Sequence, residues 1–429
     1  MKQITMQRIY FFLVQKRLLW SIFSLLWVIG CRLEPLPIAP FDYTLTHLDP
    51  SFDKIYLYDA VQLRNKDIIA TGKVLLKTGE FDALAIRLSG FGQVKEVAHF
   101  NSESNWDDEI ACMAVDSLEN IYLAGRVRDP NLIFRGIVFR ISTQDSLHKM
   151  WHRMYPPPLS ARSTFSKIVS FNPEELTVLR GTLSGQEPPD RSAGFFRIDS
   201  MGWLRGCDQY FNYYDVKGAI LLKQQVIFGG VSYGLGTSGG PGTISRLDPL
   251  SCTIQHRGHF TEVHSQFNYM ADIARGADGH ILAILNANHL ENNQTIPTKP
   301  YYFRPYFIKV LPKIGLPVVN DQTAYIALPS DTAMGRHSVS SLIGTQDGGF
   351  IYASNYTNHE VSNDFYAKIY KRSTNLGAGA MWQTPLKLPQ TQVLKIIPLA
   401  DNSVLLLAGR SFEVEINRII KINSQGVME

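Results

Sequence analysis

Histidine spacing gives the first test for metal chemistry in this sequence. His256 and His259 are separated by two residues, and His264 follows shortly after. A zinc protease instead places two histidines four residues apart on a helix, with a glutamate beside the first that acts as the base. The segment around His256 is expected to be an outer strand that runs into a loop, and no acid has the required spacing. We therefore expect solvated or partly packed histidines and no metal site.

No other catalytic pattern stands out. The chain has no Gly-x-Ser-x-Gly nucleophile turn and no Asp-rich calcium loop. The glycine-rich residues 231–240, which include Tyr233, lack the Lys-Ser/Thr ending of a phosphate loop. A strand, not a helix, is expected after them, so no helix N-terminus is present to bind phosphate. We therefore predict no catalytic residue and no cofactor, although carboxylates can still converge from distant parts of a fold.

Aromatic residues around position 302 are the best candidates for binding. The sequence there reads Lys299-Pro300-Tyr301-Tyr302-Phe303-Arg304-Pro305-Tyr306. Interfaces favour Tyr and Arg, and aromatic rings also suit stacking against sugars. The alternative is that these rings pack the segment onto its own structural unit. The candidate contacts for a ligand or partner are Tyr301, Tyr302, Phe303, Arg304 and Tyr233.

Residues 1–30 have the layout of a secretory signal. Lys16 and Arg17 precede about a dozen apolar residues, and the small Gly30 precedes Cys31. The apolar run is shorter than the roughly 20 residues that span a bilayer. A signal anchor, or a cleaved signal with an incidental Cys31, are the alternatives to a lipoprotein signal.

The segment Val28-Ile29-Gly30-Cys31 resembles the lipobox of bacterial lipoproteins. The resemblance implies cleavage before Cys31 and lipid attachment to Cys31, which would anchor the protein stably. Residues 31–41, with their three prolines, would then be a stiff tether. Arg32 in place of Asp implies retention in the outer membrane of a Gram-negative bacterium, on the periplasmic or the surface side.

The net positive charge of the chain comes from residues 1–30. The 429 residues carry 42 basic and 38 acidic groups, a formal net charge of +4. Residues 1–30 hold four basic groups and no acid, so the remainder has 42 − 4 = 38 basic and 38 acidic groups. Proteins that bind nucleic acid normally show a surplus of cations. With 45% hydrophobic and 19% charged residues, the rest is expected to be a neutral globular domain without nucleic-acid partners.

The three remaining cysteines, Cys112, Cys207 and Cys252, cannot all pair. Cys112 lies in an apolar run and is expected to be a buried free thiol. A bridge between Cys207 and Cys252 is one arrangement that the sequence leaves open. None of the spacings suits a metal.

One unit recurs seven times along the chain. The unit consists of an apolar strand, a polar turn and a second strand. The second strand ends in a small or apolar residue, at positions 72, 125, 181, 230, 285, 354 and 409. A third apolar segment follows each, with one basic residue inside it: Arg87, Arg140, Arg197, Arg246, Lys309, Lys368 and Lys421. Such runs, bounded by Gly, Asp, Asn and Ser, are strand signals. Acids that precede the second strands, such as Asp116, Asp278, Asp347 and Asp401, are expected to be turn residues.

Four strands in about 50–55 residues is the size of a β-propeller blade. We therefore predict an all-β, seven-bladed β-propeller with four-stranded blades over residues 42–429. An eight-bladed ring and an array of β-sandwiches are the alternatives. The seventh unit lacks room for a fourth strand, so residues 42–48 are expected to pair with the strand at 417–423 and close the ring.

The repeats resemble bacterial propeller repeats that read Asp-x-x-Gly-Asn-Ile-Tyr-Val-x-Gly. The nearest matches are residues 116–125, 278–285, 347–354 and 401–409. The resemblance implies the fold and a secreted or lipid-anchored location, and it implies no particular chemistry.

Insertions are expected on one face of the ring only. They occupy residues 182–192, 231–241, 286–305, 316–335 and 355–363, all in units 3 to 6. Loops on a rigid scaffold are common binding sites. We therefore expect a monomeric, non-catalytic binding or scaffold protein for an envelope protein or glycan. The alternative is a glycan hydrolase or lyase on the same face.

Overall fold

The regular secondary structure of the described residues consists of β-strands. The computed structural model describes residues 42–45, 48–104, 106–131, 133–155, 163–182, 192–207, 209–212, 214–222, 224–232, 242–260, 265–289, 302–310, 325–328, 336–357, 365–374, 381–382, 385–409 and 417–428. Within these residues, no helix is long and apolar enough to cross a membrane.

The strands follow one another in groups of four. Blades 1 and 2 contain β2 (Phe52–Gln62), β3 (Ile68–Leu76), β4 (Phe81–Leu88), β5 (Val94–Phe100), β6 (Asp107–Val115), β7 (Ile121–Arg128), β8 (Phe134–Ser142) and β9 (His148–Tyr155). Blades 3 and 4 contain β10 (Ser163–Asn172), β11 (Glu175–Thr182), β12 (Ser192–Asp199), β13 (Gln209–Asn212), β14 (Tyr214–Leu222), β15 (Gln225–Ser232), β16 (Gly242–Asp248) and β17 (Thr253–Phe260). Blades 5 and 6 contain β18 (Ser265–Arg275), β19 (Ile281–His289), β20 (Tyr302–Val310), β21 (Tyr325–Ala327), β22 (Arg336–Gly344), β23 (Gly349–Thr357), β24 (Phe365–Ser373) and β25 (Leu386–Pro389). Blade 7 contains β26 (Gln392–Pro398), β27 (Val404–Gly409), β28 (Arg418–Ile422) and β1 (Asp42–Thr44).

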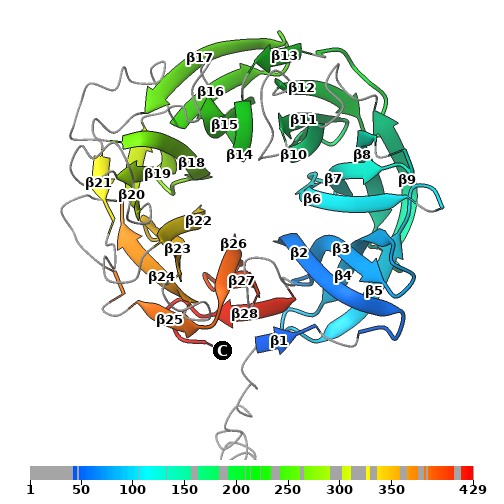
Figure 1. Cartoon of the computed structure of the whole chain (residues 1–429), viewed down its shortest axis with the longest axis horizontal. Coiled ribbons are helices and arrows are strands. Elements are labelled where there is room, and N and C mark those ends of the chain that lie inside the picture. Colours follow the sequence, from blue (N-terminus) through cyan, green and yellow to red (C-terminus); the bar gives the residue numbers. More distant parts are fainter. Residues whose placement is uncertain are drawn as a thin grey trace, which may run out of the picture. The chain divides into compact units, whose positions relative to one another are not determined.

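These groups form seven antiparallel four-stranded sheets arranged around a central axis (Figure 1). The first strand of each blade (β2, β6, β10, β14, β18, β22 or β26) lies nearest the centre. The all-β, seven-bladed β-propeller predicted from the repeats is therefore confirmed, and the eight-bladed and sandwich alternatives are wrong.

The ring closes through its first strand. In β1, Asp42 pairs with Ile420 and Thr44 pairs with Arg418, antiparallel to β28. The N–H of Leu45 then donates to the carbonyl of Asn417 at 2.7 Å. The predicted closure is confirmed, with a strand that ends at Thr44 and does not extend to residue 48. Pairing the two ends of the chain leaves blade 7 with the same number of strands as the others.

Apolar side chains pack between neighbouring blades. Among the described residues, seven hydrophobic clusters each join one blade to the next. One example places Leu57 of blade 1 against Leu405 and Ile419 of blade 7, all fully buried. The alternating apolar pattern of the repeats therefore fills the spaces between sheets.

Glycine in the middle of the second strand has a steric cause in blades 1 and 2. A Cβ at Gly72 would lie 1.8 Å from the carbonyl oxygen of Tyr56, and one at Gly125 would lie 1.8 Å from that of Glu109. In blades 1 and 2 the innermost strand approaches this position closely at its β-bulge, so the facing residue there must be small.

Two faces of the ring follow from the antiparallel order. We call the side with the connections from first to second and from third to fourth strands the short-turn face. The opposite side, with the second-to-third and blade-to-blade connections, is the long-loop face. The insertions expected at 182–192, 231–241, 286–305 and 355–363 connect second to third strands and belong to the long-loop face. The insertion expected at 316–335 is divided by β21, and residues 311–324 join the third strand to the fourth on the short-turn face, so the prediction that all insertions share one face is wrong. Most of these residues lie outside those described.

Turn acids on the short-turn face pair with the third-strand cations. Asp278 binds Lys309 at 2.7 Å, and Asp401 binds Lys421 at 3.1 Å. Asp116 accepts the N–H groups of Leu118 and Asn120, at 2.8 and 2.9 Å, as a turn residue does. The predicted turn role is confirmed.

Blade 6 differs from the sequence prediction in one position. Asp347 pairs with Lys371 at 2.6 Å, while Lys368 lies opposite Ser354 in the sheet. Lys371, not Lys368, is therefore the equivalent of Lys309. Both lysines stand in an apolar strand, and only the register distinguishes them.

Candidate functional site

A β-bulge recurs at the same level in all seven innermost strands. In β2 the pairing with β3 skips from Leu57 to Asp59, and the other six strands skip one residue in the same way. The residues that follow the bulges are Asp59, Cys112, Lys167, Gly218, Asp272, Ser341 and Lys395. We call these seven positions the bulge ring. Bulges often turn side chains toward functional sites.

The bulge ring surrounds a central cavity of about 380 Å³. Its lining includes Asp59, Cys112, Lys167, Asp272 and Lys395, and the remainder is largely aliphatic. Lining residues continue to the ends of the strands at the short-turn face, such as Arg275, Gly344 and Pro398. The volume lies at the small end of the range for ligand sites, which is roughly 300–1,000 Å³.

The two carboxylates of the bulge ring are held by the next blade. Oδ2 of Asp59 accepts the N–H of Met113 at 3.1 Å. Oδ2 of Asp272 accepts the N–H of Leu342 at 3.0 Å and the hydroxyl of Ser341 at 3.2 Å. Both carboxylates are therefore fixed in orientation, and the same contacts join blade to blade.

Lysine amines balance these carboxylates. Nζ of Lys395 lies 3.9 Å from Oδ1 of Asp59, and their side chains are 25% and 13% exposed. Asp59 raises the pKa of Lys395 above its ordinary value, and this effect outweighs burial. Burial and the charge of Lys395 lower the pKa of Lys167, which shares a hydrogen bond with Lys395. The cavity therefore holds one firmly charged amine beside a second amine that loses its proton more readily.

Cys112 completes the polar groups of the cavity. It is the buried free thiol that the sequence predicts. Burial raises the pKa of Cys112 to about 12, so it stays protonated and unreactive at neutral pH. The cavity can orient a small polar group through fixed carboxylates and amines, and the described residues of its lining include no aromatic ring on which a sugar could stack.

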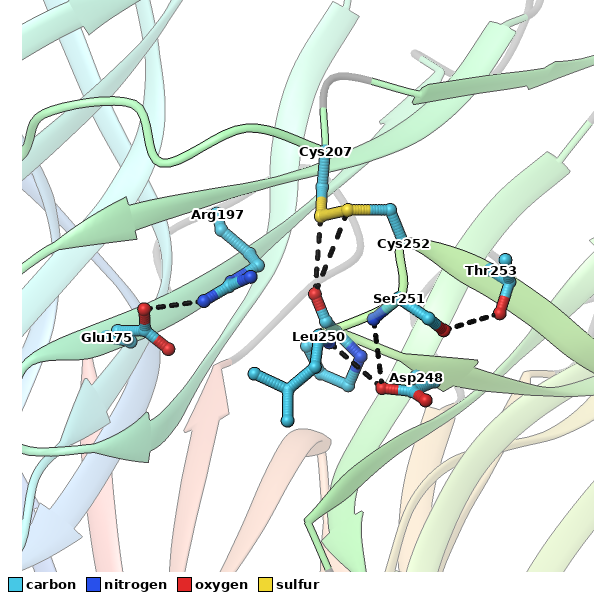
Figure 2. The surroundings of a disulfide bond; sticks show 9 residues. Glu175, Arg197, Cys207, Asp248, Leu250, Ser251, Cys252 and Thr253 are labelled. Carbon is cyan, nitrogen blue, oxygen red and sulfur yellow. Dashed lines mark hydrogen bonds and ion pairs between the residues drawn. A yellow bond between two sulfur atoms is a disulfide. The ribbon is translucent and has the colours of Figure 1, made fainter.

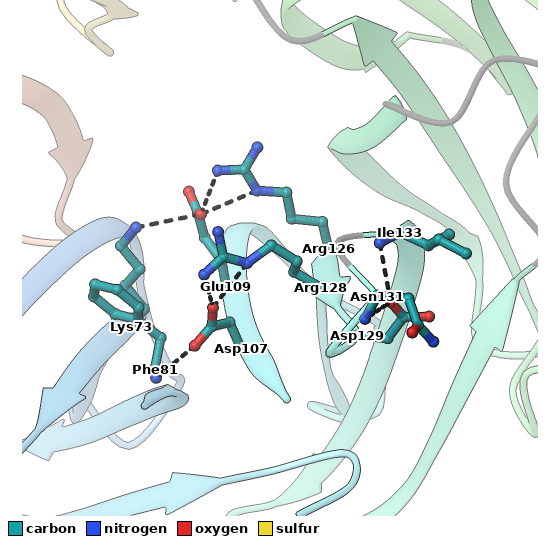
Figure 3. A network of polar contacts seen from close by, with 9 residues as sticks. All are labelled: Lys73, Phe81, Asp107, Glu109, Arg126, Arg128, Asp129, Asn131 and Ile133. Atoms are coloured by element: carbon teal, nitrogen blue, oxygen red, sulfur yellow. Dashed lines mark hydrogen bonds and ion pairs between the residues drawn. The ribbon is translucent and has the colours of Figure 1, made fainter. Parts of the chain in front are cut away.

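A second polar network lies at the long-loop ends of blades 1 and 2 (Figure 3). Glu109 receives Lys73 at 3.3 Å and Arg126 at 2.7 Å. Burial opposes ionisation of Glu109, but the two cations outweigh it and lower its pKa. Asp107 pairs with Arg128 in the same network. These carboxylates are neutralised between blades, which suits a structural role.

A disulfide joins blades 3 and 4 at the short-turn face (Figure 2). Cys207 precedes β13 and Cys252 lies between β16 and β17. The carbonyl oxygen of Pro249 lies 3.2 Å from Sγ of Cys207. The N–H of Leu250 donates to Asp248 at 2.9 Å and fixes the turn. The sequence leaves this pairing open, because the two cysteines are brought together by adjacent blades.

The side chains that the sequence predicts to bind lipid, ligand or partner lie outside the described part of the structure. Cys31, Tyr301 and Tyr233 lie outside the described residues. Tyr302, Phe303 and Arg304 begin β20 at the long-loop face, with only their backbone described. The side chains of His256 and His259 in β17 are likewise not described. In the part of the chain that the structure describes, no group of three metal-binding side chains is present.

The bulge ring is the feature that sequence reasoning missed. Its seven positions occur once per repeat, each twelve to fourteen residues before position 72, 125, 181, 230, 285, 354 or 409 of the same repeat. The signal was therefore available as a column of the repeats in which Asp, Lys, Cys and Ser replace apolar residues. Sequence alone does not show that this column faces the centre.

No protein-family model matches the chain, and no curated protein matches it. Among solved structures, the chain is similar to hydrazine synthase of Kuenenia stuttgartiensis, with 9% identity, a TM-score of 0.52, and 89% of this chain and 99% of that one covered. It is also similar to a polysaccharide lyase of family PL25, an ulvan lyase, with 8% identity, a TM-score of 0.51 and coverages of 88% and 94%. The β-propeller domain of the Trilobed protease from Pyrococcus furiosus matches with 9% identity, a TM-score of 0.47 and coverages of 86% and 93%. At these identities the similarity shows the fold alone.

Proposed function

We propose that this protein is an exported, lipid-anchored propeller of the cell envelope that binds an envelope protein or glycan and catalyses no reaction. Lipid on Cys31 would hold the protein to the outer membrane. The loops of blades 3 to 6, with Tyr233, Tyr301, Tyr302, Phe303 and Arg304, would contact the partner.

The direction of β1 is the observation that carries this proposal. β28 runs toward the short-turn face, and β1 is antiparallel to it with Asp42 opposite Ile420. Residues 31–41 are therefore joined to the ring on its short-turn side. The second-to-third loops of blades 3 to 6 belong to the opposite face, so an anchor at Cys31 would leave them available to a partner.

The Cys207–Cys252 disulfide supports export. Such bonds persist in oxidising compartments, including the bacterial periplasm and the cell surface, and are rare in the cytosol. The location is therefore consistent with the signal in residues 1–30.

Two measurements test this function. Mass spectrometry of the N-terminal peptide from membrane-extracted protein should find lipid on Cys31, and Cys31→Ser should abolish it. A pull-down from envelope membranes should recover a partner with the wild type and lose it with Tyr301→Ala/Tyr302→Ala. Recovery of the same partners by that loop variant would contradict the role of the aromatic residues.

A polysaccharide lyase is the second candidate, and Lys167 is the observation that favours it. An amine whose pKa is lowered can take the proton beside a uronate carboxylate. The glycosidic C–O bond at the next carbon then breaks, a C=C bond forms, and the leaving oxygen takes a proton from water. This chemistry would place the substrate in the central cavity.

Absorbance of the unsaturated product distinguishes the two functions. The chain is incubated with uronate-containing polysaccharides, beside its Lys167→Met variant. The binding proposal expects no increase with either protein. An increase that Lys167→Met removes would establish the lyase instead.

A further inference from the structure

Exposed apolar side chains gather on one face of the ring. In the described residues, six blades each present at least one large apolar side chain in a turn of the short-turn face. We call these residues the apolar rim: Phe91, Leu118, Trp203, Leu250, Met381 and Val427. Phe91 is 71% exposed and Leu118 is 70% exposed, so these side chains are not covered by the ring itself.

The described connections of the long-loop face expose polar side chains instead of large apolar ones. In blades 1 and 2, the described connections of the long-loop face expose Lys77, Thr78, Asn101 and Glu103. Leaving an apolar side chain in water has a cost of roughly 25 cal/mol per Å² of its surface. Among the described residues, the large exposed apolar side chains lie in turns of the short-turn face or, as Val94 and Met150 do, near the short-turn ends of the outer strands β5 and β9. This distribution points to a surface that is covered in the working protein.

The turns of the apolar rim are held firmly. The guanidinium of Arg153 lies 3.8 Å from the centre of the Trp203 ring. The Cys207–Cys252 disulfide fixes the turns of Trp203 and Leu250 relative to each other (Figure 2). Rigid apolar tips can enter an apolar phase without losing further conformational entropy.

The attachment point of the chain identifies what covers this face. Asp42 lies on the short-turn side of blade 7, and ten residues separate it from Cys31. Ten extended residues reach at most about 35 Å. A lipid on Cys31 would therefore bring a bilayer within reach of the apolar rim. Trp beside Arg is also a combination found at membrane interfaces.

We propose that the short-turn face docks on the membrane surface, with the apolar rim inserted at the level of the head groups. This proposal rests on the lipid anchor of the proposed function. Lys66 is exposed in one of these turns and suits lipid phosphates. Arg64 and Arg205 are exposed there too, with Arg64 donating to the carbonyl of Ser117 at 2.7 Å and Arg205 paired with Asp199 at 3.0 Å. Acids are present there too, so insertion of apolar side chains, and not net charge, drives the docking.

Docking also decides how the central cavity is reached. The cavity lining extends to the short-turn ends of the innermost strands. On a docked ring, Lys167 and Lys395 therefore face the head-group layer. A long polysaccharide would not enter from that side, so membrane docking counts against the lyase.

Fluorescent probes on matched positions test the docking. The full lipidated chain is reconstituted in phosphatidylcholine and phosphatidylglycerol vesicles that contain a nitroxide-labelled lipid. Phe91→Cys and Leu118→Cys carry the probe on the apolar rim, and Thr78→Cys and Asn101→Cys carry it on the long-loop face. Quenching several-fold stronger at 91 and 118 than at 78 and 101 is the expected result.

Other outcomes overturn the proposal in separable ways. Equal quenching at all four positions overturns the docked orientation and leaves the lipid anchor intact. Probes at 91 and 118 that are shielded from iodide without lipid quenching show a protein cover, such as a second copy, in place of the membrane. Absence of lipid on Cys31 by mass spectrometry overturns the anchor and, with it, the docking that depends on it.

Discussion

Asp108 is a fully buried carboxylic acid at the start of β6. Its Oδ2 accepts the N–H of Ser102 at 2.8 Å, and its Oδ1 has no hydrogen-bond partner among the described residues. Burial raises the pKa of Asp108 to about 7, with a further contribution from Asp82. In the unfolded chain the group would titrate near 3.8. Asp108 therefore keeps its proton in the folded state over a pH range in which the unfolded chain has lost it.

This difference gives the folded protein a pH dependence of known sign. A raised folded pKa contributes stability that is present below pH 4 and is lost as pH rises to 7. Asp108→Asn keeps the acceptor for Ser102 and removes the titration. We expect the wild type to lose up to about 4 kcal/mol relative to Asp108→Asn between pH 4 and pH 7. Urea unfolding of both proteins at each pH measures it, and parallel stability curves would contradict the prediction.

The two lysines of the bulge ring should respond differently to removal. Lys395 balances Asp59, so Lys395→Met leaves a carboxylate without its counter-charge and should cost on the order of 2–3 kcal/mol. Lys167 has a lowered pKa because its charge is disfavoured, so Lys167→Met should change stability by less than about 1 kcal/mol. Denaturant midpoints of the two matched variants give the comparison. A larger loss for Lys167→Met would reverse this assignment of charge.

At the scale of single elements, ring closure depends on a very short strand. β1 has three residues, and Leu45 beside it is buried against Leu57 and Ile419. Leu45→Ala removes this contact and should cost about 2–4 kcal/mol. Leu118→Ala on an exposed turn is the control and should change stability by less than about 0.5 kcal/mol. Equal thermal midpoints for the two variants would show that β1 does not hold the ring closed.

The disulfide between blades 3 and 4 should also contribute to the free energy of unfolding. Its cysteines are 45 residues apart, and closing a loop of that length stabilises a protein by about 4 kcal/mol in the chain-entropy model. Cys207→Ala/Cys252→Ala should therefore unfold at lower denaturant. A reductant should destabilise the wild type and leave the double variant unchanged. A wild type that is insensitive to complete reduction would rule out this contribution.

Strands and turns were predictable because their signals are local. The apolar runs recur in every blade and the turn acids in several, and the spare segment before the first unit led to β1. Register was less accessible, since Lys368 and Lys371 stand in the same strand and only the pairing with β23 tells them apart. The register also places Arg180 and Ala408, one residue before the predicted positions 181 and 409, as the equivalents of Gly72 in blades 3 and 7.

The candidate site was harder to predict because it depends on the bulges. Asp59 and Lys395 lie in strands at opposite ends of the sequence, and closure of the ring makes them neighbours. Without the bulge, the alternation of side chains would turn the same positions toward the other side of the strand. No local pattern specifies that shift.

At the scale of the whole ring, the two faces have different chemistry. The short-turn face carries the apolar rim, the start of β1 at Asp42 and the strand ends that line the cavity. The long-loop face carries the second-to-third insertions of blades 3 to 6. A ring that docks by the first face presents the second to the periplasm or the exterior, so anchoring and partner binding can proceed together.

Reactivity of Lys167 provides a test of this arrangement. Its lowered pKa makes the amine a good nucleophile, and the docked membrane should shield it from a charged reagent. We expect sulfosuccinimidyl acetate to acylate Lys167 slowly in the vesicle-bound wild type and several-fold faster in Phe91→Ser/Leu118→Ser, which weakens docking. Lys77 on the long-loop face is the internal control and should react equally in both proteins. Mass spectrometry of the peptides measures both rates, and an unchanged rate at Lys167 would mean that the cavity does not face the membrane.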